Sequence, residues 1–311
     1  MTSHLHTLDR MSPRAWAAFA TMSVLWGIPY LFIKVAVDDG VPPAFVAWAR
    51  VVLAALVLLP LAWRARALGS LRGRGRWLLA YAVVEISIPF PLIAFGETHV
   101  SSSTTAIAIA TVPLIASLLA LRFAPGERLT GRRLAGMLLG FGGVAALVGI
   151  DVSGSADELL GIAAIVAAAA GYACGPLIMS RGLNDLDGRA TMGVSLALAA
   201  LVLTPLAALD PPTEVPPTGA IAAIVVLGIV CTAAAFVAFA VLVRTAGPSR
   251  AVIITYVNPV IALALGVALL GEQPGAGALV GLLLILLGSW LSTDGRLPPP
   301  VERWLAAGAA R

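Results

Sequence analysis

Residues 111–127 read TVPLIASLLALRFAPGE, and residues 257–272 read VNPVIALALGVALLGE. Each stretch is an apolar run with a proline near its start and a Gly-Glu pair at its end. A proline inside a helix removes one backbone hydrogen bond and clashes with the preceding turn. We therefore expect helix interruptions at Pro113 and Pro259. Their spacing of 146 positions indicates a chain built from two related halves.

The composition is that of a membrane protein. Hydrophobic residues make up 59% of the sequence and charged residues 12%, with a mean hydropathy of +0.97, whereas soluble domains usually carry roughly 25% charge. A bilayer-spanning helix needs roughly 20 apolar residues, so the chain has room for about ten spans. We expect them at residues 15–37, 44–63, 77–96, 100–121, 132–150, 158–179, 190–209, 218–243, 249–270 and 275–293.

The arginines predict how these spans are oriented. Lysine and arginine accumulate in the cytoplasmic loops of membrane proteins. With the N-terminus inside, 18 of the 20 lysines and arginines fall in cytoplasmic segments and none falls in an outer loop. The other two, Lys34 and Arg50, lie within spans. The sequence thus predicts an N-in, C-in plasma-membrane protein, and its pI near 9.6 reflects this orientation and not a nucleic-acid partner.

Several residues of the two halves coincide when the second half is shifted back by 145 or 146 residues. Because five spans is an odd number, the second copy would cross the membrane inverted. We expect repeats at 15–150 and 158–293, with cytoplasmic ends at 1–14 and 294–311. Inverted repeats with matching helix interruptions are typical of transporters with a midplane site. The aligned pairs are Pro113 with Pro259, Glu127 with Glu272, Gly136 with Gly281, Gly143 with Gly288, and Trp26 with Tyr172.

The stretches LWGIPYLFIKVAV (25–37) and ARVVLAALVLLPL (49–61), together with both proline-to-Gly-Glu-to-glycine patterns, resemble the EamA family of the drug/metabolite transporter superfamily. The resemblance covers nearly the whole chain. It implies two inverted five-helix bundles around a cavity lined mainly by spans 1, 3, 4, 6, 8 and 9. It also implies export or exchange of small metabolites, often amino acids or related compounds. The second repeat departs from the first: Ser180 stands where Lys34 does, and Ser195 or Leu196 where Arg50 does.

Glu85 is the single most informative residue. At roughly 1.5 Å per residue, it lies near the middle of the third span. An acid at that depth costs about 2.5–3.5 kcal/mol on insertion scales and usually faces a cavity or a partner. We expect it to bind substrate or a proton, and the alternative is a structural carboxylate bonded between helices.

Lys34 and Arg50 are candidates for coupling or gating. Lys34 can extend its ammonium to the membrane surface, which makes an interfacial anchor the equal alternative. Arg50 lies about two turns deep, where it could close an outer gate, bind a substrate carboxylate, or bridge helices as part of the scaffold.

Aromatic and polar side chains recur at i, i+4 and i+8 on three spans, which places each set on one helix face. Such faces suit an amphipathic metabolite, although ordinary helix packing gives the same spacing. Span eight adds Phe236, and span nine adds Tyr256 and Asn258. The three sets are Trp26, Tyr30 and Lys34; Tyr81, Glu85 and Pro89; and Tyr172, Pro176 and Ser180.

Glycines spaced four apart in spans five and ten (Gly136 and Gly140, Gly277 and Gly281) are small-residue packing motifs. We read them as helix contacts, with a homodimer through these spans as a further possibility. Cys174 and Cys231 lie inside apolar runs and read as small buried side chains. We expect no metal and no cofactor.

A secondary transporter of a small metabolite in the lipid bilayer, working outward by alternating access, is the function that these features favour. An enzyme is disfavoured because no protease, metalloenzyme or nucleotide-binding motif is present. A protein that handles lipids or assembles the envelope remains the alternative, since a fold does not by itself specify cargo.

Overall fold

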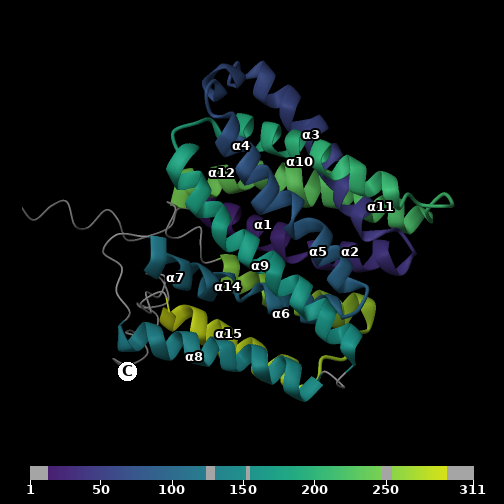
Figure 1. Cartoon of the computed structure of the whole chain (residues 1–311), viewed down its shortest axis with the longest axis vertical. Helices are drawn as coiled ribbons and strands as arrows, with labels where there is room; N and C mark the ends of the chain where they lie inside the picture. The colour runs from purple at the N-terminus through teal and green to yellow at the C-terminus, as the bar shows by residue number, and fades with distance from the viewer. Residues whose placement is uncertain (1–12, 124–129, 152–154, 247–253, 293–311) are drawn as a thin grey trace, which may run out of the picture.

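The structure is a computed structural model, and it describes residues 13–123, 130–151, 155–246 and 254–292 (Figure 1). All regular structure in these ranges is helical. Glu127, residues 249–253 of the ninth predicted span and the tail at 294–311 lie outside the described residues.

The helices of the first half follow the predicted spans to within a few residues. They are α1 (Pro13–Gly27), α2 (Pro29–Asp38), α3 (Pro43–Arg64), η1 (Leu68–Leu71), α4 (Gly75–Tyr81), η2 (Ala82–Ser87), α5 (Pro89–Glu97), α6 (Ser102–Ile109), α7 (Val112–Phe123), α8 (Gly131–Ala146) and η3 (Leu147–Asp151).

The second half has fewer breaks. Its helices are α9 (Ala156–Gly182), α10 (Gly188–Leu209), α11 (Thr218–Val225), η4 (Val226–Ala234), α12 (Ala235–Ala246), α14 (Ile254–Leu270) and α15 (Ala276–Ser292).

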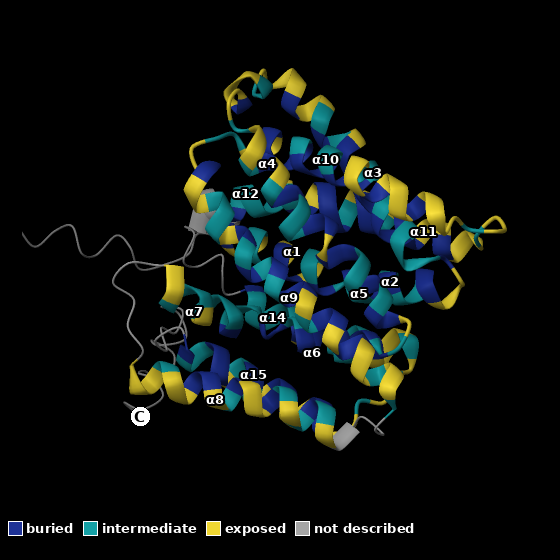
Figure 2. Cartoon of the chain, in the orientation of Figure 1, coloured by how far each residue is buried: buried dark blue, intermediate teal, exposed yellow. Residues whose placement is uncertain are grey.

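Eight of these helical segments are long and apolar enough to cross a bilayer, and α14 and α15 are shorter apolar helices of 17 residues. Exposed residues lie along the outer faces of the bundle (Figure 2), and many of them are large apolar residues. Leu138, Leu201 and Leu283, for example, are 65%, 70% and 69% exposed. The prediction of an all-helical chain that crosses a membrane several times is confirmed.

Prolines interrupt three spans of the first half. The first span breaks at Ile28, just before Pro29, and the third at Ile88, just before Pro89. The fourth breaks at Ala110 and Thr111, just before Pro113. By contrast, α14 runs through Pro259 without a break. The predicted interruption there is wrong, because a proline removes only one backbone hydrogen bond and the turns on either side of it remain helical.

Two π-helical segments occupy equivalent places in spans three and eight. In η2 the Ser87 hydroxyl donates to the Ala82 carbonyl at 2.9 Å, and in η4 the Thr232 hydroxyl donates to the Leu227 carbonyl at 2.8 Å. Both bonds reach five residues back, and the two hydroxyls are 145 positions apart. π-helical turns are rare and often occur at functional sites. We therefore look for the functional site near these two segments.

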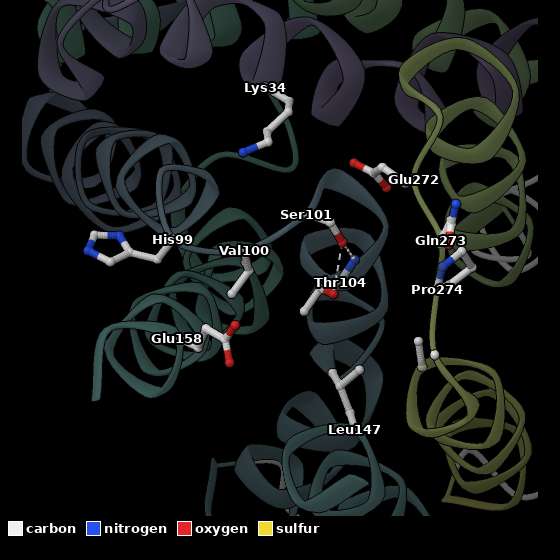
Figure 3. A pocket seen from close by; sticks show the side chains of 12 residues that line it. Lys34, His99, Val100, Ser101, Thr104, Leu147, Glu158, Glu272, Gln273 and Pro274 are labelled. Carbon is white, nitrogen blue, oxygen red and sulfur yellow. Dashed lines mark hydrogen bonds between the residues drawn. The ribbon is translucent and has the colours of Figure 1, made fainter. Parts of the chain in front are cut away.

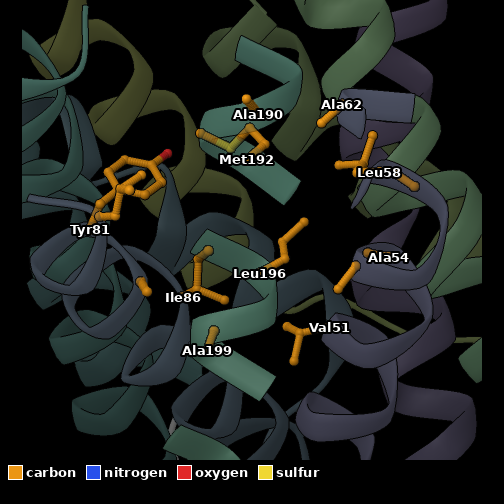
Figure 4. Close-up of a cluster of buried hydrophobic side chains, with 14 of the residues drawn as sticks. Val51, Ala54, Leu58, Ala62, Tyr81, Ile86, Ala190, Met192, Leu196 and Ala199 are labelled. Carbon is orange, nitrogen blue, oxygen red and sulfur yellow. The ribbon is translucent and has the colours of Figure 1, made fainter. Parts of the chain in front are cut away.

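Equivalent helices of the two halves pack against each other in antiparallel directions. Trp48 on α3 donates its indole N–H to Thr204 on α10 at 3.1 Å, while further along α3 Leu58 approaches Gly193 near the start of α10. Between these two contacts the helices form an apolar core with η2 (Figure 4). Its buried members include Val51, Ala54, Leu58, Ile86, Leu196 and Ala199.

The glycines of α8 and α15 form the second antiparallel pair. Gly136 lies against Gly288 and Ser292, and Gly143 lies against Gly281. The backbones approach closely because no side chain separates them. The predicted glycine packing is thus confirmed as a contact within the chain. A homodimer through these two spans stays a prediction.

The remaining contacts also come in related pairs. The third span (α4, η2 and α5) packs on α9 of the sixth, and the eighth span (η4 and α12) packs on α1 of the first. Likewise, α7 of the fourth span packs on α9, and α14 of the ninth packs on α1. Helices of the first half therefore pack against helices of the second half along the centre of the bundle.

Candidate functional site

Arg50 on α3 is the cation at the meeting of the two halves. It is 8% exposed, and its Nε donates to the Thr232 hydroxyl of η4 at 2.8 Å. Its guanidinium carbon lies 4.0 Å from the centroid of the Phe90 ring on α5, a distance at which a cation is attracted to the ring face. These contacts join the second, third and eighth spans.

Two tyrosines lie near this cation. The Phe90 ring meets the Tyr172 ring of α9 edge to face, with centroids 6.5 Å apart. Tyr30 on α2 and Tyr172 both lie within electrostatic range of Arg50. We call this group the Arg50 cluster: Arg50, Tyr30, Phe90, Tyr172 and Thr232.

The sequence named three members of the Arg50 cluster and missed two. Arg50, Tyr30 and Tyr172 were candidate site residues, and the structure brings them together. Thr232 and Phe90 carried no sequence signal of their own. Thr232 could have been found from the hydroxyls of Ser87 and Thr232, which stand at equivalent positions of the two halves.

No ion pair neutralises Arg50 within the part of the chain that the structure describes. Ion pairs between described residues join Lys34 with Asp38, Arg74 with Asp185, and Arg189 with Asp187. Nor does any hydrogen bond between described residues use the two terminal nitrogens of Arg50, since its single bond comes from Nε. These donors face the site without an acceptor from the protein.

Glu85 lies on η2 and points toward the sixth span. Its carboxylate packs against Gly175 of α9, where any larger residue would collide with it. Oε2 is buried and has no hydrogen-bond partner. Glu85 lies within electrostatic range of Tyr81 and Tyr172, so Tyr172 is near both Arg50 and the acid.

Trp26 belongs to a separate aromatic group. Its ring centroid lies 5.0 Å from that of Phe239 and 6.1 Å from that of Phe236, both on α12. The one-residue break at Ile28 places Trp26 on α1 and the other two on α2. That Trp26, Tyr30 and Lys34 share a substrate-facing surface stays a prediction.

Asn258 and Tyr256 lie half-buried on α14. With its amide nitrogen as donor, Asn258 bonds the backbone carbonyls of Ser23 and Ile254 at 3.2 and 2.9 Å. Asn258 thus fastens α14 to α1. A role for it in holding substrate stays a prediction, as does one for Tyr256.

Lys34 does not contact Arg50. Its ammonium bonds Asp38 Oδ1 and the Glu97 carbonyl, each at 2.9 Å. It lines an open pocket of about 510 Å³ together with His99, Ser101, Glu158 and Glu272 (Figure 3). We call the end of the bundle that holds this pocket the acidic end, and define it by Asp38, Glu97, Glu158 and Glu272.

Glu272 explains one of the recurring Gly-Glu pairs. Its Oε1 accepts the Ser102 N–H at 2.8 Å, and its Oε2 accepts the Ser103 N–H at 3.0 Å and also the Ser103 hydroxyl. Gly271 has a φ of +67°, which turns the chain so that the carboxylate can reach α6. An acid of the second half therefore caps a helix of the first half at its positive end.

Replacing Glu272 with alanine is expected to lower the stability of the folded protein by about 1–2 kcal/mol, because the first N–H groups of α6 lose their acceptor. A thermal unfolding scan in detergent measures this as a lower Tm. Gln273→Ala is the matched control, because Gln273 is the exposed neighbour in the same loop. Equal Tm values for the two variants would contradict the capping role.

Metal chemistry finds no support in the described ranges: no group of three or more His, Cys, Asp or Glu side chains is placed there to hold an ion. Cys174 is half-buried and Cys231 is buried, and both are free thiols.

Comparison with known proteins places these features in context. The model of the EamA-like transporter family matches residues 14–149 and again residues 159–293. A probable terminal-alkyne amino-acid exporter of Streptantibioticus cattleyicolor is 30% identical over 91% of this chain and 94% of its own. A probable amino-acid metabolite efflux pump of Escherichia coli K12 is 26% identical over 88% of this chain and 92% of its own.

One solved crystal structure covers 90% of this chain and 96% of its own length with a TM-score of 0.64 and 21% identity. At that identity the likeness concerns the fold alone.

Proposed function

The chain belongs to the EamA-like transporter family, and from that premise we propose that this multi-pass membrane protein is a secondary transporter of a small metabolite. The cargo is an amino acid or a related compound, and it moves outward across the plasma membrane by alternating access. The names of the two full-length relatives, an amino-acid exporter and an amino-acid metabolite efflux pump, support this cargo class and direction.

The observation that carries the proposal is the Arg50 cluster. A membrane-embedded cation with unused donors is costly unless it faces a polar cavity or a ligand. Here it lies where α3 and α5 of the first half meet η4 of the second. A cargo bound at this place touches both halves, and it can be released on either side as they move relative to each other.

The moving parts are two inverted five-helix repeats, residues 15–150 and 158–293. Three observations support this division: the family model matches twice, α3 with α10 and α8 with α15 pack antiparallel, and π-helical segments recur in spans three and eight. With the N-terminus inside, the acidic end faces outward and the arginine-rich end, which holds Arg74 and Arg181, faces the cytoplasm.

Contacts between the halves exist at both ends and would have to alternate. At the acidic end, Glu272 binds the start of α6. At the arginine-rich end, Arg74 bonds the Gly182 carbonyl at 3.0 Å and Asp185 at 2.7 Å. Each contact consists of a few charge-assisted hydrogen bonds. Cargo binding and thermal motion together can break that number of bonds. Opening to the outside would release Glu272, and opening to the inside would release Arg74.

Cells that express this chain are expected to release more of one class of amino acid into the medium than cells with an empty vector. Tyr172→Ala should lower the release about tenfold, which corresponds to the loss of roughly 1.4 kcal/mol of binding. Trp63→Ala is the control, because that indole on α3 is 71% exposed. Amino-acid analysis of the medium gives the readout, and equal release by the Tyr172→Ala and wild-type proteins would argue against the site.

A further inference from the structure

We propose that Arg50 binds a carboxylate of the cargo, so that the transporter selects compounds with a free carboxylate over otherwise identical compounds without one. This inference rests on the proposed function and names the chemistry that its site recognises.

The first step is the missing counter-charge. Arg50 is permanently charged and 8% exposed, yet its described contacts are one hydroxyl and one aromatic ring. A buried charge is normally paired, because neither a hydroxyl nor a ring replaces the hydration that a guanidinium loses. The partner is therefore a group that arrives with the cargo.

The second step is geometry. The bond from Nε to Thr232 and the ring of Phe90 hold the guanidinium at two points. The bond leaves both terminal nitrogens available, and a carboxylate can accept from a guanidinium through two parallel hydrogen bonds. The hydroxyls of Tyr30 and Tyr172 lie in electrostatic range of the same cation. They can donate to the remaining lone pairs of a bound carboxylate.

The third step excludes Glu97 as the built-in partner. Glu97 is the acid in electrostatic range of Arg50, and it is fully buried. Both of its carboxylate oxygens lack a hydrogen-bond partner, so it does not bind the guanidinium. Arg50 and Glu97 therefore form no ion pair with each other.

The fourth step uses the second half as an internal control. Helices α3 and α10 have 22 residues each and carry prolines at matching positions, Pro60 and Pro205. Ser195 of α10 stands where Arg50 does, and it is fully buried. Because the same helix packs at the equivalent place without a cation, the architecture does not require an arginine there. Arg50 therefore has a role that belongs to the first half alone and that helix packing does not explain.

Counterflow into proteoliposomes tests the inference with matched pairs of probes, such as leucine with leucinamide and phenylalanine with phenylalaninamide. Each amide keeps the side chain and the amine but loses the carboxylate. We expect wild-type protein to exchange the acids at least about tenfold faster than the amides. Arg50→Gln should lose the exchange of acids by a similar factor, whereas exposed Arg72→Gln should keep it.

Two further variants keep the test valid if Arg50→Gln does not fold. Arg50→Lys keeps the charge but not the fork of donors, and Thr232→Val removes the acceptor that orients Nε. Both should raise KM for the acids several-fold while the Tm stays near the wild-type value. Equal wild-type rates for acid and amide, or an unchanged KM for the acids in all folded variants, would overturn the inference.

The same assay separates the two proposals. If wild-type and Arg50→Gln proteins exchanged amides or amines at the same rate as each other and as fast as the acids, carboxylate recognition would be overturned. The protein would still be a metabolite carrier. Absence of any exchange by folded wild-type protein would remove the carrier itself and, with it, the role of Arg50.

Discussion

Gly288→Leu is expected to prevent the protein from folding. A Cβ at this position would collide with the Gly140 backbone nitrogen and would lie 2.5 Å from the Gly136 carbonyl oxygen and 2.6 Å from the Gly140 Cα. These are backbone atoms, so no side chain can rotate away and α8 and α15 must separate. Overpacking of a tight interface usually costs about 1–3 kcal/mol, and a rigid backbone contact on both sides raises this further.

Size-exclusion chromatography of the purified variant measures the effect as loss of the monodisperse peak. The control is Gly142→Leu on the same helix, because Gly142 is exposed and a Cβ there would meet no atom within 4 Å. If Gly288→Leu eluted like Gly142→Leu with an unchanged Tm, the packing of α8 on α15 would be wrong.

Glu85→Gln is expected to abolish the pH dependence of transport. Glu85 is the acid on η2, its Oε2 is buried without a partner, and glutamine keeps its shape without its charge. If Glu85 carries the coupled proton, acidifying the outside drives protons in and accelerates export by the wild-type protein. The variant should export at a rate that no longer depends on the gradient and is about tenfold lower at acidic external pH.

Transport at two external pH values, measured in the same proteoliposomes, provides the comparison. Asp157→Asn is the matched control, since Asp157 is an exposed acid at the start of α9. A pH profile that is identical in wild-type and Glu85→Gln proteins would assign Glu85 to the scaffold.

Much of the fold could be predicted from the sequence because the signal for each span is local. An apolar run of about 20 residues and its flanking charges lie within one segment of chain, so the predicted spans differ from the helices by only a few residues. The break before Pro113 was predictable for the same reason. Pro259 could not be distinguished from Pro113 in the sequence, because a proline removes only one backbone hydrogen bond and does not by itself decide whether a helix breaks.

The site was harder to predict because it is assembled from distant parts of the chain. Arg50 and Thr232 are separated by 182 positions, and no local pattern links them. The sequence identified Arg50 as unusual because the second repeat lacks it, and identified Tyr30 and Tyr172 by helical spacing. It could not show that Phe90 lies under the guanidinium, or that the π-helical turn of η4 carries Thr232 to it. Likewise, the glycine motifs were visible, but their partner helix was not.

Solute counterflow by the purified wild-type protein tests the central claim most directly. Proteoliposomes loaded with an excess of one unlabelled amino acid are diluted into a trace of the same labelled amino acid. Alternating access at a site shared by both halves predicts a transient overshoot of label inside, which saturates with external concentration and disappears when the lumen is empty. Folded protein that gives no overshoot with any member of an amino-acid panel, or uptake that rises linearly without saturation, would contradict it.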